Sequence, residues 1–397
     1  MIRKDFLRNK YFILILFVGF MPLFMGDYCR YLLALFIPFA FLRWKGTTNG
    51  LLIAGFSISY TAAFVFRGES LSASAIIYYL IYPATLYITG YNLCRRFRNN
   101  QSIVWLMVLM AFSIALPAIY YNLLDFLQSG QLIRVGRDIT YGEDGIKRAA
   151  TGYGMMMSLT LGLTGLLFCV CDNKSDFKRK VFSLIIAVTA IFCTVRLLNR
   201  TGLAIAAISC IAAILSLGIS VKRLFYILSA VVLVAIGIYI LNEHSPLLAD
   251  AIENYSRRDF GTGSVEGFGG RDERWSAALV QIIERPFGDT GLDLGGYYNY
   301  AHNLWLDTGI RGGLLSLILL LIITCKFIKR GIKVYKFGAV SKFERQVLLL
   351  IGVAFMLQLF TEPIIEGLPQ FFWLWLFFLG ILDSFPCIYR NRQNCSV

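Results

Sequence analysis

The 397-residue chain is 57% hydrophobic and 16% charged, whereas soluble proteins carry about 25% charged residues. A mean hydropathy of +0.65 excludes a soluble globular enzyme, a disordered protein and a secreted disulfide scaffold. The composition predicts a polytopic membrane protein. The net charge of +14 is explained by basic loops that set the topology, and we expect no nucleic-acid partner.

We predict an all-α fold, a polytopic bundle of about 12 transmembrane helices, because a helical span needs about 20 mostly apolar residues. Helices 1 to 9 fall within residues 1–242 and helices 10 to 12 within 304–397, with one large periplasmic loop at 243–303 between them. In chain order the apolar segments cover residues 11–25, 31–42, 51–66, 71–93, 103–124, 153–171, 181–195, 203–220, 224–241, 304–325, 347–360 and 371–388. No small-x-small cleavage site follows the first segment, so we expect it to remain as a membrane anchor.

The basic residues predict the orientation, because Lys and Arg concentrate in cytoplasmic loops. This rule places both termini in the cytoplasm. The basic residues on the periplasmic side are then all arginines except Lys147. An arginine fork matches phosphate, whereas lysine offers a point charge. The bias favours recognition of a phosphate or diphosphate, although loss of lysine by drift explains it equally well.

The periplasmic loop at 243–303 contains two candidate helices. Leu248, Ile252 and Tyr255 share a face in the first, and Trp275, Leu279 and Ile282 share a face in the second. Both patterns are typical of helices that lie in the membrane interface, and a small packed subdomain explains them equally well. Between the two helices, residues 261–270 are rich in glycine and predict a flexible hinge.

His302 lies in YAHNLWLDTGIRGG, where this loop enters an apolar helix. A neutral imidazole at that place can accept a proton from a substrate hydroxyl. The structural alternative is an interfacial histidine at the entry of the helix. Asp307 and Arg311 follow at i, i+4 spacing in the favourable order, and ionisable residues at membrane depth suggest function. For these two we favour a self-neutralising pair that holds the His302 region in place.

Two arginines are predicted at the level where a lipid diphosphate meets the membrane surface. Arg200 opens an apolar helix from the outer side, and Arg271 precedes the Trp275 helix. Their structural alternatives are a snorkelling interface residue for Arg200 and a solvated loop charge for Arg271.

Other polar residues of the outer loops give weaker signals. Glu362 and Glu366 have the chemistry to orient a sugar or an acceptor amine, but we expect them to be loop charges. An interfacial aromatic belt explains the tyrosines better than sugar stacking does; these are Tyr297, Tyr298 and Tyr300. We find no metal motif in the sequence, and we expect neither a metal nor a cofactor.

Four short segments together resemble the O-antigen ligase and polymerase superfamily of bacterial envelope glycosyltransferases. They are AATGYGMMMS at 149–158, NRTGLAI at 199–205, the stretch from Arg271 to PFG at 286–288, and HNLWLDTGIRGG at 302–313. Their order and their topological sides also fit the family. The resemblance covers roughly the C-terminal two thirds of the chain.

The resemblance implies a metal-independent, inverting transfer of a glycan from an undecaprenyl diphosphate carrier on the periplasmic side. It places the diphosphate-binding arginines of the family on Arg200 and Arg271 and its essential histidine on His302, as the base for the acceptor hydroxyl. The acceptor is lipid A–core for a ligase, and another lipid-linked repeat unit for a polymerase. We expect supporting roles for Asn303, Asp307, Arg311, Arg196 and Arg274.

We favour the ligase, because the segments at 149–158 and 199–205 are more ligase-like. The polymerase is the close alternative, since the linker from Phe287 to His302 is shorter than in many ligases. The family often carries Glu five residues after the histidine, where this chain has Asp307. A flippase for lipid-linked oligosaccharides is less favoured, because the charges gather at one face.

Overall fold

The computed structural model describes residues 2–22, 24–42, 46–96, 100–133, 138–141, 146–169, 171, 174–216, 271–294, 298–336 and 340–393. Within these residues the chain is almost entirely helical. The α-helices are α1 (Ile2–Gly19), α2 (Phe36–Phe41), α3 (Thr48–Phe66), α4 (Ala73–Ile76), α5 (Tyr82–Arg96), α6 (Asn100–Ser129), α7 (Ala150–Gly162), α8 (Lys174–Arg196), α9 (Arg200–Ser216), α12 (Arg271–Glu284), α13 (Leu304–Tyr335), α14 (Lys342–Thr361), α15 (Ile364–Gly367) and α16 (Pro369–Gln393). The 3-10 helices are η1 (Phe24–Leu35) and η3 (Leu163–Phe168), and η2 (Ile77–Ile81) is a π-helix.

The described helices are those of a multi-pass membrane protein. Six of them are long and apolar enough to cross a membrane. The predicted apolar segments overlap helical structure wherever the structure describes them; residues 217–220 of one segment and all of 224–241 lie outside the described residues. The segment at 31–42 is divided between η1 and α2.

Close backbone contact holds α5 against α16. A Cβ atom on Gly90 would collide with the carbonyl oxygen of Phe377, and one on Gly380 would collide with that of Tyr87. Small residues permit such close approach between membrane helices. The side chains of α16 are almost all buried from Phe371 to Leu382, so α16 forms the centre of the bundle.

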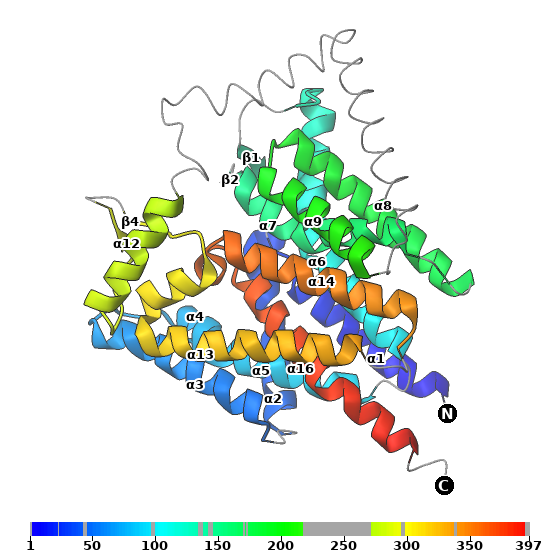
Figure 1. Ribbon diagram of the computed structural model, residues 1–397, viewed down its shortest axis with the longest axis horizontal. Helices are drawn as coiled ribbons and strands as arrows, with labels where there is room; N and C mark the ends of the chain where they lie inside the picture. The colour runs from blue at the N-terminus through cyan, green and yellow to red at the C-terminus, as the bar shows by residue number, and fades with distance from the viewer. Residues whose placement is uncertain are drawn as a thin grey trace.

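The long helices run between two ends of the bundle (Figure 1). α1 begins and α16 finishes at one end, and α12 and β4 lie at the other. The first half of α13 lies between α12 and α3, and it packs against both. We call the end that carries α12 the α12 end, and Arg271 and the His302 turn lie there.

Two small antiparallel sheets modify the predicted all-α fold. β1 (Asp138–Tyr141) pairs with β2 (Ile146–Ala149) so that Asp138 lies opposite Ala149. β3 (Leu292–Asp293) pairs with β4 (Tyr298–Asn299), with Leu292 opposite Asn299. Both sheets lie in loops between helices, so the spans themselves remain helical.

The second helix predicted in the large loop is confirmed as α12, but its buried face differs from the predicted one. Leu279 is 53% exposed, whereas Ala278 and Ile282 are buried against Leu292, Ala301 and Ile310. α12, β3 and the start of α13 therefore form a small packed subdomain. The predicted first helix and the glycine-rich hinge lie outside the described residues.

Candidate functional site

His302 stands in the short connection between β4 and α13. Its backbone has φ +55°, a left-handed conformation that non-glycine residues rarely adopt. The next residue, Asn303, is the N-cap of α13 and accepts hydrogen bonds from the amides of Trp305 at 3.1 Å and Leu306 at 3.2 Å. The turn that presents His302 is thus part of the start of the helix.

Asp307 fixes this turn from inside the first part of α13. Its Oδ1 accepts a hydrogen bond from the amide of Ala301 at 2.7 Å, and its Oδ2 accepts one from the amide of Asn303 at 2.9 Å. The two amides flank His302, so Asp307 holds the His302 region as expected. The predicted ion pair is wrong as a direct contact, because no salt bridge among the described residues joins Asp307 to Arg311, although the charge of Arg311 still acts on Asp307.

Glu362 links His302 to α12. This residue follows α14, and its side chain is only 3% exposed. Its Oε2 lies 3.2 Å from Nδ1 of His302, and its Oε1 lies 3.8 Å from Nη2 of Arg271. We call His302, Glu362 and Arg271 the His302 cluster. The expectation of a solvated loop charge at Glu362 is therefore wrong.

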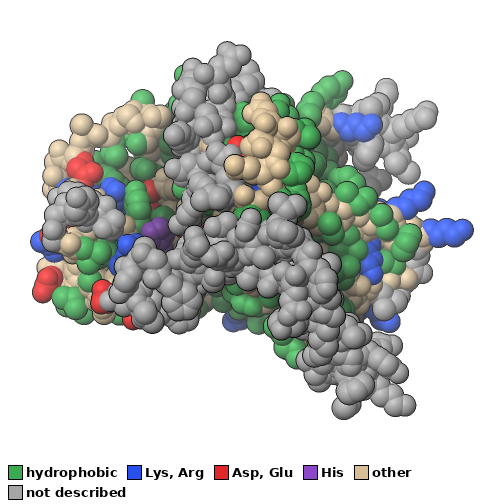
Figure 2. Space-filling view, turned by 90° about the horizontal axis from the view of Figure 1, so that it is seen from above, with side chains coloured by type: hydrophobic (Ala, Val, Ile, Leu, Met, Phe, Trp, Pro, Cys, Tyr) green, Lys and Arg blue, Asp and Glu red, His purple; other side chains and the backbone are tan. Residues whose placement is uncertain are grey.

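The His302 cluster is accessible at its two basic members. The side chains of His302 and Arg271 are 29% and 23% exposed. In Figure 2, histidine and acidic side chains lie beside Lys and Arg side chains at the α12 end. A shared buried carboxylate between two accessible basic groups suits a site that handles both a proton and an anion.

Trp275 sets the position of α12 relative to His302. Its indole N–H donates to the carbonyl oxygen of Ala301 at 2.9 Å, and its ring packs edge-on against Phe360 at 5.0 Å. The side chain of Asn303 donates to the carbonyl oxygen of Phe360 at 3.3 Å. α12, the His302 turn and the end of α14 are therefore fastened together around the cluster.

A break in α13 brings together two of the four segments that carry the family resemblance. Gly313 has φ +77° and ψ 176° inside the helix. The turn at Pro286–Gly288 inserts there: the amide of Leu314 donates to the Pro286 carbonyl at 2.8 Å, and the amide of Asp289 donates to the Ile310 carbonyl at 2.6 Å. The segments at 286–288 and 302–313 thus form one interlocked unit.

The other two segments that carry the family resemblance, at 149–158 and 199–205, also contact each other. The side-chain amide of Asn199 donates to the carbonyl oxygen of Ala150 at 2.9 Å. A Cβ atom on Gly154 would collide with the same amide. This contact packs the start of α9 against α7, immediately before Arg200.

The three remaining predicted arginines occupy different environments. Arg200 is the exposed first residue of α9 and lies outside the set of contacts that defines the His302 cluster. Arg274 is half-buried on α12, one turn after Arg271. Arg196 is fully buried, which sets it apart from a surface phosphate ligand.

The buried Arg196 guanidinium ties α8 to the end of α6. It donates to Asp125, to Ser129 at 3.1 Å, to the Gln131 carbonyl at 3.0 Å, and to the carbonyl and side-chain oxygens of Asn122 at 3.2 and 3.3 Å. These bonds engage every nitrogen of the group. Arg196 is a structural brace in this arrangement.

Arg311 belongs to a second group of polar side chains. Its guanidinium lies 5.9 Å from the ring centre of Tyr300. Glu366, on α15, accepts a hydrogen bond from the hydroxyl of Tyr60 on α3. Burial raises the pKa of Glu366, and the Tyr60 bond and the charge of Arg311 oppose that rise. We call Tyr60, Tyr300, Arg311 and Glu366 the Arg311 cluster; Glu366 too was expected to be a loop charge.

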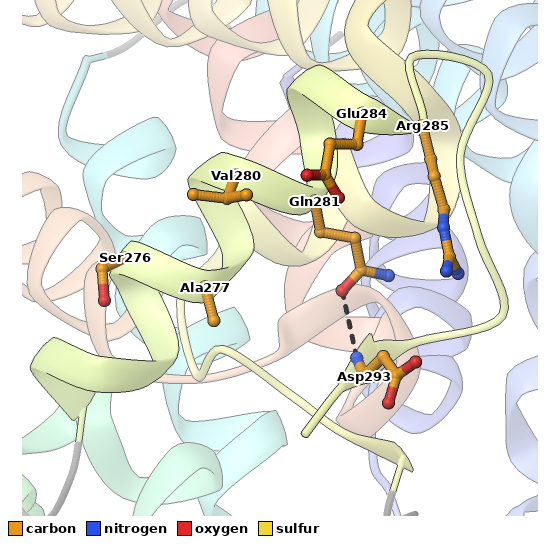
Figure 3. A pocket seen from close by; sticks show the side chains of 7 residues that line it. All are labelled: Ser276, Ala277, Val280, Gln281, Glu284, Arg285 and Asp293. Atoms are coloured by element: carbon orange, nitrogen blue, oxygen red, sulfur yellow. Dashed lines mark hydrogen bonds between the residues drawn. The ribbon is translucent and has the colours of Figure 1, made fainter. Parts of the chain in front are cut away.

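A concavity of about 490 Å³ lies on another face of α12. Its lining residues include Val280, Gln281 and Asp293, and the amide of Asp293 donates to the Gln281 side chain at 3.0 Å (Figure 3). The lining contains no member of the His302 cluster. By helical spacing, the lining residues on α12 face away from Arg271 and Trp275. We therefore identify the candidate site from the chemistry of the His302 cluster and not from this concavity. Among the described residues no group of three His, Cys, Asp or Glu side chains is arranged to hold a metal ion.

Comparison with known proteins links part of the chain to a known family. No curated protein matches the sequence. Residues 182–321 match the family model described as O-Antigen ligase. The matched residues include Arg200, Arg271 and His302, whereas Glu362 and Glu366 lie beyond them. The match supports the assignment of this multi-pass membrane protein to the O-antigen ligase superfamily.

Proposed function

We propose that the protein is an O-antigen ligase of the bacterial inner membrane. It transfers a glycan from undecaprenyl diphosphate to lipid A–core on the periplasmic side, without a metal and with inversion at the anomeric carbon. The donor bond to diphosphate is already activated, so the protein has two tasks. It takes a proton from the acceptor hydroxyl, and it holds the departing diphosphate.

The contact between His302 and Glu362 carries this proposal. A carboxylate that accepts the Nδ1–H of an imidazole leaves the lone pair of Nε2 free to accept a proton. The acceptor oxygen forms the new bond to the anomeric carbon, and its proton passes to Nε2 of His302. The bond from the anomeric carbon to the diphosphate oxygen breaks, and Glu362 stabilises the imidazolium.

Arg271 and Arg200 hold the diphosphate in this proposal. Arg271 stands near Glu362 at 3.8 Å, a separation that leaves N–H groups of its fork available to phosphate oxygens. It is also the first residue of α12, and the start of a helix favours anions. Arg200 has the corresponding place at the start of α9.

The alternative function is polymerisation of lipid-linked repeat units, which uses the same donor and the same two tasks. The description of the matched family and the ligase-like segments at 149–158 and 199–205 favour the ligase. A flippase is less favoured, because transport requires no base on a histidine.

Deletion of the gene in its own host, followed by gel analysis of the lipopolysaccharide, tests the function. Bare core with long glycan on the carrier lipid is the result expected for a ligase. Core that bears a single repeat unit identifies a polymerase, and single repeats trapped on the cytoplasmic face identify a flippase. An unchanged ladder contradicts all three functions. Complementation by wild-type protein but not by a folded His302→Asn variant is the result expected for the base.

A further inference from the structure

The Arg311 cluster assembles chemistry beside His302 that neither proton removal nor diphosphate binding uses. Its members come from α3, the loop before α13, α13 itself and α15. Tyr60 is almost fully buried, whereas Tyr300, Arg311 and Glu366 are each partly exposed. The inner part of the cluster is therefore buried, and its outer part is accessible.

Two buried N–H groups at the Arg311 cluster have no hydrogen-bond acceptor within the described residues, one on Arg311 and one on the neighbouring Arg67. Arg67 donates from Nη1 to the Arg311 carbonyl at 2.6 Å and from Nε to Glu69 at 2.8 Å. Nη2 of Arg67 and Nε of Arg311 are buried, and in the described part of the chain neither meets an acceptor. A buried N–H without an acceptor is costly, so these two donors favour a ligand that carries acceptor oxygens.

Aromatic rings line the same place. Tyr79 packs edge-on against Tyr60 at 5.4 Å and stacks on Phe64 at 5.7 Å. Tyr79 belongs to the π-helix η2, a feature that is frequent at functional sites. Partly exposed rings beside a carboxylate and a guanidinium provide an apolar face with donors and acceptors around it, which suits a sugar ring with its hydroxyl groups.

The two clusters lie on different sides of α13. Arg271 reaches Glu362 from α12, whereas Tyr60 reaches Glu366 from α3. The first half of α13 lies between α12 and α3 (Figure 1). His302 and Tyr300 are two residues apart in the turn that precedes α13. In the proposed mechanism His302 serves both substrates, so a diphosphate on the Arg271 side leaves the Tyr300 side for the acceptor.

We propose that Tyr300, Arg311 and Glu366 bind the acceptor saccharide and orient its hydroxyl toward His302, while the buried Tyr60 holds the carboxyl group of Glu366. This inference rests on the proposed function and assigns the acceptor to one side of the same site. Glu366 accepts hydrogen bonds from sugar hydroxyls, Arg311 donates to their oxygens, and Tyr300 contributes its hydroxyl and its ring.

Transfer kinetics with the full-length protein in lipid nanodiscs test this proposal. The variants are Glu366→Gln and Tyr300→Phe, and the controls are Glu284→Gln and Tyr120→Phe, which change exposed residues of α12 and α6. The acceptor probes are lipid A–core from the deletion strain and purified lipid-linked repeat unit. We expect each site variant to raise the acceptor KM about tenfold, the equivalent of one or two lost hydrogen bonds, with the donor KM and both controls unchanged.

The outcomes separate this proposal from the proposed function. If the wild-type protein transfers no glycan to either acceptor, the proposed function is wrong, and if a folded His302→Asn protein transfers normally, the role of His302 as the base is wrong. If His302→Asn is inactive but both site variants keep the wild-type acceptor KM, or raise only the donor KM, the acceptor assignment alone is wrong. The probe whose KM responds identifies the acceptor as core or as repeat unit. Native mass spectrometry of acceptor binding to His302→Asn, with and without Tyr300→Phe, covers the case in which Glu366→Gln fails to fold: weaker binding supports the assignment and unchanged binding overturns it.

Discussion

The carboxylate of Glu362 lies 3.2 Å from Nδ1 of His302, although 60 positions separate the two residues along the chain. Asp307 holds the backbone on both sides of His302, and Glu362 meets its ring. The imidazole is therefore fixed at its backbone and at one nitrogen. This arrangement leaves the other nitrogen for chemistry.

Replacement of Glu362 by Gln tests the orienting role. The amide keeps the shape but no longer stabilises a charged imidazolium, so we expect kcat to fall at least about tenfold and up to about 10⁴-fold. The acceptor KM should change little, because Glu362 does not contact the acceptor in the proposed mechanism. Purified protein and a gel-based transfer assay measure both constants. Glu284→Gln on α12 is the matched control, and a normal kcat in Glu362→Gln would refute the role.

The left-handed backbone of His302 predicts that replacement of this residue by glycine does not lower the stability of the protein. A non-glycine residue with φ +55° stores about 1 kcal/mol or more. His302→Gly should abolish transfer while the unfolding temperature stays equal to that of wild type or rises, and His302→Val should abolish transfer and lower that temperature. Tryptophan fluorescence during heating in detergent compares the three proteins. A large loss of stability in the glycine variant would show that the histidine side chain itself holds the turn.

The sequence predicted the helices and the His302 turn because local signals are enough for both. Long apolar segments identify the spans, and Asn303 and Asp307 lie within five residues of His302. Glu362 and Glu366 could not be assigned in this way. In the sequence they stand between two apolar segments like ordinary loop charges, and only the fold buries Glu362 against His302 and brings Glu366 to Tyr60.

The break in α13 could not be predicted from the sequence either, because the glycines that permit it and the turn that stabilises it lie in different segments of the chain. Gly312 and Gly313 lie inside an apolar segment that otherwise predicts one continuous helix. The turn at Pro286–Gly288 that satisfies the freed backbone groups belongs to a different loop. For the same reason a supporting role at the site was expected for Arg196, since its acceptors lie on α6 and just after it, more than 60 residues earlier.

Gly313 and Gly331 form a matched pair within α13. A Cβ atom on Gly313 would lie 2.5 Å from the Pro286 carbonyl oxygen, and its φ of +77° disfavours any side chain, whereas Gly331 has nothing within 4 Å. We expect Gly313→Ala to lower the free energy of unfolding by about 2–4 kcal/mol. Gly331→Ala should be neutral or stabilising by about 0.5–1 kcal/mol. Thermal unfolding of both variants measures this, and equal effects would contradict the break.

Arg196 and Arg271 should respond to lysine in opposite ways. Lysine cannot reproduce the bonds of Arg196, so Arg196→Lys should cost about 2–3 kcal/mol of stability, with a normal donor KM for the protein that remains folded. Arg271→Lys should leave the unfolding temperature unchanged and raise the donor KM about tenfold, because the fork to phosphate is lost. Loss of stability in Arg271→Lys with a normal donor KM would assign Arg271 to structure.

The buried carboxyl of Glu366 predicts how stability depends on pH. Burial raises its pKa above the ordinary value of 4.5, so over the range that starts near pH 4.5 and extends upward the folded protein binds more protons at this group than the unfolded chain does. The contribution of Glu366 to stability is therefore fully present below pH 4.5 and is lost as pH rises through the raised pKa. Glu366→Gln removes the titrating group, so the stability lost between pH 4.5 and pH 7 should be smaller in the variant than in wild type. Unfolding temperatures measured at both pH values compare the two proteins, with Glu284→Gln as the control that should follow wild type. An equal loss in Glu366→Gln and wild type would mean that Glu366 remains ionised in the folded protein across this range, with the charge of Arg311 and the Tyr60 hydroxyl outweighing its burial.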